Sequence, residues 1–267
     1  MSKARKQPGR YDVIIVEIFQ RHYHEGIESF EFSRSEFAEV AAHLGIVLHK
    51  NLGDVLYSFR FRKDLPKVIS DTAPLGLEWV IELAGHANYR FRLSQINRIL
   101  PNPNLIQIKI PDSTPEIIAK YALSDEQALL AKVRYCRLLD IFLGITTYSL
   151  QNHLRTTVPN IGQIEIDEIY VGVNRNGTHF VIPVQAKGGD DQLGVVQTKQ
   201  DIACCAVKFP ELICRPVAAQ FMADNIIAMF ELALEKDEIA VVEEKHYKLV
   251  LGDEISGEDL RSYRVRE

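Results

Sequence analysis

One acid and one lysine lie on two neighbouring segments of the chain, in a pattern that suits metal-assisted cleavage of a phosphodiester. Asp167 ends the segment GQIEID, and Gln185-Ala186-Lys187 ends the segment PVQAK. Mg²⁺ prefers oxygen ligands and usually takes one or two carboxylates from a protein. Asp167 would supply a carboxylate, Gln185 its side-chain carbonyl and Ala186 its main-chain carbonyl. Lys187 would orient a metal-bound water and neutralise the phosphate.

Two paired strands are needed to bring these residues together, and residues 162–189 predict such a hairpin. Both segments are rich in β-branched residues. The residues 175–177 between them suit a three-residue loop in which Gly177 takes the left-handed conformation. We therefore expect Asn174 to pair with Thr178 across the loop.

The same register would gather polar side chains on one face of the hairpin. It places Asp167 opposite Gln185 and Glu165 opposite Lys187, and side chains alternate between the faces of a strand. A register shifted by one residue would scatter this set. The other face would carry Ile166, Val184 and Ala186, with Glu168 as its polar exception.

The two segments resemble the core of the PD-(D/E)xK nuclease superfamily, which includes many restriction endonucleases. Asp167 matches the acid of the first strand, and Gln185 and Lys187 match the (D/E)xK element. The resemblance covers roughly the C-terminal half of the chain and implies a Mg²⁺-dependent endonuclease that hydrolyses duplex DNA to 5′-phosphates, most like a type II restriction enzyme. Two positions depart from the family pattern. Gln185 replaces an acid, which weakens metal binding, and no Pro precedes Asp167.

Other interpretations of the hairpin stay open. In a half-solvated sheet, Glu165, Lys187 and Glu168 would be surface charges. The apolar flanks of both strands favour burial instead, and a buried Asp or Lys needs a partner or a metal. The replacement at Gln185 is also compatible with a DNA-binding regulator whose nuclease-like domain is inactive. A structure-selective repair nuclease is the third possibility.

A helix is expected at 194–205, directly after the hairpin, as in the family. Gln197 and Gln200 are three residues apart and share a helix face. Together with Glu165, they are expected to support the catalytic residues; an exposed polar stripe is the alternative for the two glutamines.

The whole pattern predicts an α/β (α+β) fold with a mixed, restriction-endonuclease-like sheet covered by helices on both faces. The other expected elements are helices from Ser124 towards Gly144, at 147–155 and at 225–234, and strands at 212–214, 216–219 and 240–243.

The N-terminal part predicts three helices followed by a hairpin. The helices are expected at 11–23, 36–44 and 51–61, with Ser33 and Glu36 forming a capping box for the second. The hairpin is expected at 79–83 and 89–93. This order resembles a winged helix-turn-helix domain, in which the third helix enters the major groove and the hairpin acts as the wing.

The resemblance to a winged helix implies a set of DNA contacts. The alternative is that the arginines of this set are solvated or paired with acids of the second domain. Residues 1–110 hold 15 basic and 12 acidic residues, a net charge of +3, while the whole chain carries −5. A locally basic face is therefore compatible with phosphate binding. The candidates are Asn51, Tyr57, Ser58, Arg60 and Arg62 from the third helix, and Arg90 and Arg92 from the hairpin.

A proline-punctuated connector at 94–123, with a short strand expected at 106–110, suggests two domains. We place the boundary near Pro111, which gives a winged-helix-like domain at 1–110 and a nuclease-like domain at 111–267.

Of the 267 residues, 46% are hydrophobic and 25% charged, which is ordinary for a globular protein. The sequence shows neither a long apolar span nor a signal peptide, and four cysteines without metal-ligand spacing suggest reduced thiols in a cytoplasmic protein. Because two strands must be cut, a homodimer is expected.

Overall fold

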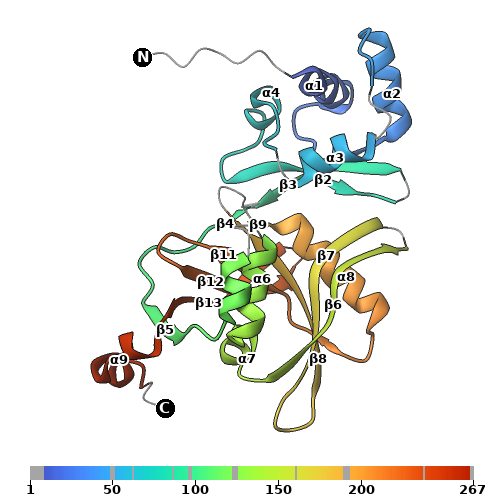
Figure 1. The fold of residues 1–267 in the computed structure, drawn as a ribbon. Helices are drawn as coiled ribbons and strands as arrows, with labels where there is room; N and C mark the ends of the chain where they lie inside the picture. The colour runs from blue at the N-terminus through green and yellow to red at the C-terminus, as the bar shows by residue number, and fades with distance from the viewer. Residues whose placement is uncertain are drawn as a thin grey trace, which may run out of the picture. The chain divides into compact units, whose positions relative to one another are not determined.

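A computed structural model describes residues 9–48, 52–61, 63–85, 87–95, 98–121, 126–159, 161–188, 193–236 and 238–264. They fall into two compact units, whose elements are labelled in Figure 1. Unit 1 takes in the described residues of 1–97 and 157–163, and unit 2 those of 98–156 and 164–267. The predicted boundary near Pro111 falls at the end of strand β5 (Gln107–Pro111), which belongs to the sheet of unit 2. None of the helices in these ranges has the length and apolar character required to span a membrane.

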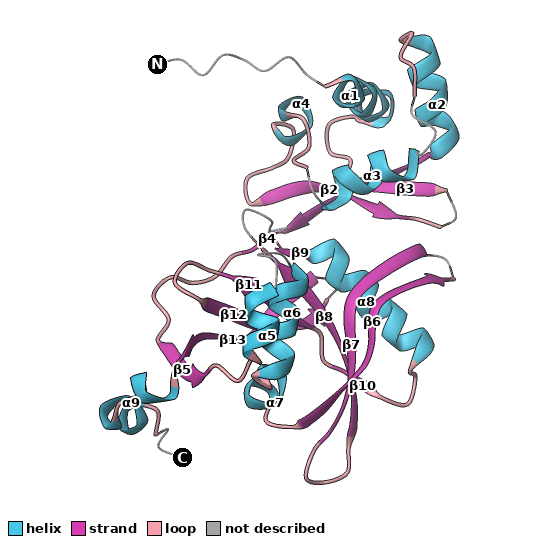
Figure 2. Cartoon of the chain, in the orientation of Figure 1, coloured by secondary structure: helices cyan, strands magenta, loops and turns pink. Residues whose placement is uncertain are grey.

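Unit 1 combines helices with an antiparallel sheet of three strands in the order β1-β3-β2 (Figure 2). The predicted helices at 11–23, 36–44 and 51–61 and the predicted hairpin are all present, while the first strand was not predicted. The elements are α1 (Arg10–His22), β1 (Ser29–Ser33), α2 (Arg34–His43), α3 (Leu52–Phe61), α4 (Lys67–Ser70), β2 (Leu77–Leu83) and β3 (Asn88–Gln95).

Aromatic packing fixes the first helix of unit 1 on its sheet. The amphipathic α1 buries Phe19, whose ring meets Trp79 and Phe91 edge-on, with 5.2 Å between ring centroids in both contacts. The start of α2 is fixed by the predicted cap, because Ser33 Oγ accepts a hydrogen bond of 3.1 Å from the backbone N–H of Glu36.

Unit 2 is built on an eight-stranded mixed sheet in the order β5-β13-β12-β11-β8-β7-β6, with β10 also paired to β8. Strand β8 pairs antiparallel with β7 and parallel with β11, which places it inside the sheet. Strands β4 and β9 form a separate pair. The strands are β4 (Arg98–Ile99), β5 (Gln107–Pro111), β6 (Thr146–Val158), β7 (Gly162–Val173), β8 (His179–Lys187), β9 (Leu193–Gly194), β10 (Ile213–Cys214), β11 (Val217–Phe221), β12 (Ile226–Glu235) and β13 (Glu238–Val250).

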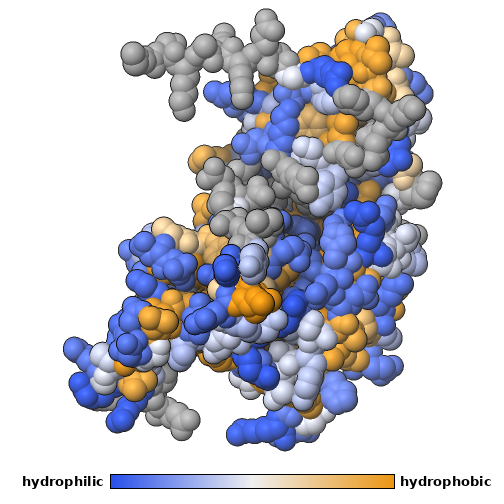
Figure 3. Space-filling view, viewed as in Figure 1, coloured by the Kyte–Doolittle hydropathy of each residue, from blue (hydrophilic) through white to orange (hydrophobic). Residues whose placement is uncertain are grey.

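Helices cover both faces of the inner part of this sheet. Val184 and Ala186 of β8 pack into one apolar core with α6 and α7, whereas Gln185 between them contacts α8 on the other face. A mixed sheet with helices on both faces is what the sequence predicted. On the face of unit 2 seen in Figure 3, hydrophilic residues predominate and apolar residues form separate patches. The helices are α5 (Glu116–Tyr121), α6 (Glu126–Tyr135), α7 (Leu138–Leu143), α8 (Val195–Lys208), α9 (Gly257–Ser262) and the 3₁₀ turn η1 (Gly252–Glu254).

Two predicted helices of unit 2 are strands, and the predictions were wrong for different reasons. Residues 147–155 belong to β6, where threonine and tyrosine favour the extended backbone and pairing with β7 decides the outcome. Residues 225–234 overlap β12, an inner strand that is buried on both faces for most of its length. Such a strand has a continuous apolar sequence, which periodicity cannot distinguish from a buried helix.

The hairpin register is the predicted one. Asn174 donates its backbone N–H to the carbonyl of Thr178 at 3.2 Å, and Glu168 lies opposite Val184. Gly177 has a φ of +79°, the left-handed conformation expected for this loop. Continued along both strands, this register brings Asp167 opposite Gln185.

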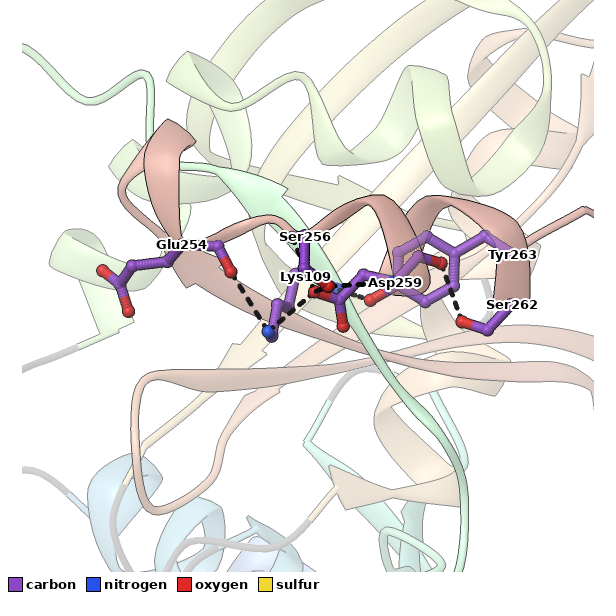
Figure 4. A network of polar contacts seen from close by, with 6 residues as sticks. All are labelled: Lys109, Glu254, Ser256, Asp259, Ser262 and Tyr263. Carbon is purple, nitrogen blue, oxygen red and sulfur yellow. Dashed lines mark hydrogen bonds and ion pairs between the residues drawn. The ribbon is translucent and has the colours of Figure 1, made fainter.

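The C-terminal segment covers the edge of the sheet at β5 through a polar network (Figure 4). The phenol oxygen of Tyr263 accepts a hydrogen bond of 3.0 Å from the backbone N–H of Lys109, so this edge group has a partner. Lys109 Nζ also bonds the Asp259 carboxylate at 2.9 Å. Hydrogen bonds from Ser256 and Lys109 lower the pKa of Asp259 to about 2.

Asp259→Asn is expected to loosen α9 from β5, because the variant loses the charge that binds Lys109. Faster amide hydrogen exchange over 257–262 would show this. Since the folded pKa lies below the ordinary carboxyl value, the stabilisation is complete above about pH 4 and is lost as the pH falls towards 2. The exposed Asp253→Asn is the control, and equal exchange in both variants would contradict the expectation.

Candidate functional site

The middle of β7 and the end of β8 bring the predicted catalytic residues to one place. Asp167 Oδ2 accepts a hydrogen bond of 2.9 Å from the backbone N–H of Ala186, the residue between Gln185 and Lys187. Asp167 and Lys187 are both half-buried; burial raises the pKa of Asp167, and the charge of Lys187 opposes that rise. The structure therefore joins the acid and the lysine that the sequence singled out.

Gln185 is held at both ends of its amide. Its Oε1 accepts a hydrogen bond from Gln197 Nε2, and its Nε2 donates one to Asp201 Oδ2, each 2.7 Å long. The side chain is 2% exposed. The carbonyl that the sequence offered as a metal ligand is thus engaged by Gln197, and Gln185 acts in this structure as a buried link between two residues of α8.

Helix α8 supplies both partners of Gln185 because Gln197 and Asp201 are four residues apart and share one face. The helix predicted at 194–205 is confirmed. Gln197 and Gln200 are both buried, so they do not form an exposed polar stripe. Asp201 was missed by sequence reasoning. Its signal was its spacing from Gln197 and its position before the apolar run Ile202 to Val207, where an acid is out of place.

Burial dominates the electrostatics of the two acids. Desolvation raises the pKa of Asp167, against the opposing effects of the Ala186 N–H and of Lys187. Desolvation also raises the pKa of Asp201 well above the ordinary value; the Gln185 hydrogen bond opposes this, and the charge of Asp167 adds to it. The charge of Asp167 therefore acts on Asp201 in a poorly hydrated place.

The two glutamates of the first strand lie in ion pairs. Glu165 pairs with Arg155 at 3.0 Å and with His153 at 3.2 Å, both from β6. Glu168 is fully buried on the α6 side and pairs with Arg134 of α6 at 2.7 Å. Glu168 is therefore not a surface charge, and Glu165 forms ion pairs with β6, the edge strand of the sheet.

The donor set of the site fits a hard divalent cation. Asp167 and Asp201 offer carboxylate oxygens, and Mg²⁺ usually needs no more than one or two of these. Two buried oxygens in the site, Asp201 Oδ1 and Gln220 Oε1, have no hydrogen-bond partner in the part of the chain that the structure describes. Gln220 lies opposite Lys187 on β11, so both side chains are on the α8 face. Among the described residues, however, no three His, Cys, Asp or Glu side chains form a metal-binding group.

The candidate DNA-binding residues of unit 1 are less open than the sequence suggested. Arg90 pairs with Glu31 at 2.7 Å, and Arg92 with Glu82 at 3.0 Å. These acids belong to unit 1 itself, whereas the sequence suggested acids of the second domain. Tyr57 and Ser58 are half-buried. Burial lowers the pKa of Arg60 to about 10. Asn51 and Arg62 lie outside the described residues.

No family model matches the sequence, and no curated protein or solved structure is similar enough to count as a match. Function is therefore inferred from the residues of the site and their geometry.

Arg134→Ala is expected to destabilise unit 2, because it leaves the Glu168 carboxylate buried without its cation. Removing one partner of a buried pair costs on the order of 3 kcal/mol of unfolding free energy. Urea unfolding measures this. Arg137→Ala breaks a pair whose arginine is 60% exposed, so its cost is about 1 kcal/mol or less. Similar costs for the two variants would contradict the structural role given to Glu168.

Proposed function

We propose that this protein is a Mg²⁺-dependent endonuclease that hydrolyses phosphodiester bonds in duplex DNA. The observation that carries the proposal is that Asp167 and Lys187 lie half-buried on two neighbouring strands, and that Asp201 of α8 faces the same site. This combination of acids and a lysine is the one that the PD-(D/E)xK resemblance implies. By that resemblance the enzyme is a type II restriction endonuclease that leaves 5′-phosphates.

Each residue of the site has a distinct part in the proposed reaction. When bound, Mg²⁺ supplies positive charge at the phosphate and lowers the pKa of a coordinated water. Asp167 holds the cation through its carboxylate, and the Ala186 carbonyl is the expected neutral ligand. Lys187 neutralises the phosphate and orients the attacking water in line with the leaving oxygen. The Gln197–Gln185–Asp201 chain fixes the position of α8 against the two strands.

Duplex DNA is the proposed partner of unit 1. Its first three helices and the β2–β3 hairpin support a winged-helix-like role, with α3 as the element that enters the major groove and β2–β3 as the wing. Two cuts require two active sites, so we propose a homodimer as the form that cleaves both strands.

One observation favours a second candidate, a DNA-binding regulator with an inactive nuclease-like domain. The Gln185 carbonyl already accepts a hydrogen bond from Gln197, and the position that carries an acid in the family has a neutral amide here, which binds a cation weakly. Incubating the protein with long duplex DNA and Mg²⁺ separates the candidates. The absence of fragments favours the regulator, discrete bands favour sequence-specific restriction, and cleavage only at irregular structures favours a repair nuclease.

Asp167→Asn and Lys187→Met are each expected to lower the rate of Mg²⁺-dependent cleavage on the order of a hundredfold or more, because each removes a charge that acts on the reacting phosphate. Gel analysis of fragment formation measures the rate. Asp224→Asn and Lys208→Met make the same changes at exposed positions and should leave the rate unchanged. Near-normal cleavage by either site variant would refute the assigned roles.

Arg90→Ala and Arg92→Ala are expected to weaken DNA binding to all sequences and to flatten its dependence on salt, because fewer counterions are released. The whole chain is titrated with labelled duplex at several salt concentrations. Arg21→Ala, which breaks an exposed ion pair on α1, is the control. The same loss of affinity in all three variants would argue against a specific role for the hairpin.

A further inference from the structure

Two buried acids flank the hairpin, and only one of them has a charged partner. Glu168 lies on the α6 side, where Arg134 and Ser149 donate hydrogen bonds to its Oε1. Asp201 lies on the α8 side and is 2% exposed. The hydrogen bond at its Oδ2 comes from the neutral amide of Gln185. Its Oδ1 has no partner within the described ranges, and neither has Oε2 of Glu168, so the two acids differ in that Arg134 offsets the charge of Glu168.

A buried acid without a charged partner lowers the stability of the folded protein unless another group binds it. A buried carboxylate needs an ion pair, several hydrogen bonds or a metal. The charge of Asp167 opposes ionisation of Asp201, and Lys187 favours it. Gln220 Oε1 on the same face is also buried without a partner in the described residues. The α8 side of the hairpin therefore has more oxygen acceptors than the described residues satisfy.

We propose that Asp201 is the second acidic ligand of a divalent cation that it shares with Asp167, and that it replaces the carboxylate missing at position 185. Gln185 is a positioning residue, which holds Oδ2 and leaves Oδ1 for the cation. This inference rests on the proposed function, since the cation is the one that the nuclease would use. Oxygen ligands select a hard cation such as Mg²⁺ or Mn²⁺.

Metal binding to the full-length chain tests the inference without any cleavage readout. Mn²⁺ is the probe, followed by calorimetric titration and by the rise in Tm that it causes. Asp201→Asn is expected to weaken Mn²⁺ binding about tenfold or more and to abolish the rise in Tm. The Tm of the metal-free variant is expected to be unchanged or higher, because a buried charge is removed. Glu168→Gln, which changes the buried acid on the opposite face, should retain Mn²⁺ binding.

A purely structural Asp201 would give the opposite pattern. In that case Asp201→Asn would lower the Tm of the metal-free protein and leave the response to Mn²⁺ intact, and the inference would be overturned. Cation binding that is retained in Asp201→Asn but lost when Cys204, Cys205 and Cys214 are replaced by serine would also overturn it, because these thiols lie close enough to Asp201 to interact with it electrostatically.

Gln185→Glu provides a second test that does not depend on the folding of Asp201→Asn. Adding a carboxylate beside Asp201 should raise Mn²⁺ affinity about tenfold and lower the Tm of the metal-free protein through like-charge repulsion. Unchanged affinity would place the cation elsewhere and overturn the inference. If Mn²⁺ binding requires Asp201 but the protein does not cut DNA, the proposed nuclease activity is refuted and the inferred cation site is retained. DNA cleavage together with Mn²⁺ binding that is unchanged in Asp201→Asn would support the nuclease and overturn the inference about Asp201.

Discussion

Strand β8 is buried on both faces, and this constraint shapes the whole of unit 2. On one face Val184 and Ala186 enter the apolar core beneath α6 and α7. On the other face the sequence places Gln185, a polar side chain that is 2% exposed. A buried amide must be hydrogen-bonded, so α8 has to present a donor and an acceptor at this point. Gln197 and Asp201 meet that requirement, and they fix the rotation of α8 about its axis.

The two faces deal with buried charge in different ways. On the α6 side Glu168 receives a guanidinium at its Oε1, so its charge has a partner within the protein, although its Oε2 has none among the described residues. On the α8 side Asp167 accepts a backbone hydrogen bond and Asp201 an amide hydrogen bond, and the charge of Asp167 still opposes the ionisation of Asp201. Stability alone favours the first arrangement, because it neutralises the acid. The second arrangement is the one expected where acids are kept ready for a ligand, since perturbed carboxyls concentrate at functional sites.

The sequence predicted local features well and long-range ones poorly. The register of the hairpin follows from the Asn174–Thr178 loop and from side-chain alternation, both of which are local. The same holds for the cap at Ser33. Strand β12 was predicted as a helix because burial on both faces removes the period that distinguishes the two. Asp201 was missed because its role depends on the packing of α8 against β8, and its spacing from Gln197 becomes informative only when that packing is known.

The arginines of unit 1 show why a net charge does not predict a binding face. Arg90 and Arg92 are held by Glu31 and Glu82, so their charges are largely compensated in the free protein. The Arg90 pair is exposed, with 42% and 54% of the two side chains accessible, and such pairs contribute at most about 1 kcal/mol. A phosphate could therefore displace Glu31 at low cost. The Arg92 pair is more buried, at 16% and 17%, and would resist exchange. DNA contact by this hairpin thus depends on Arg90 more than on Arg92.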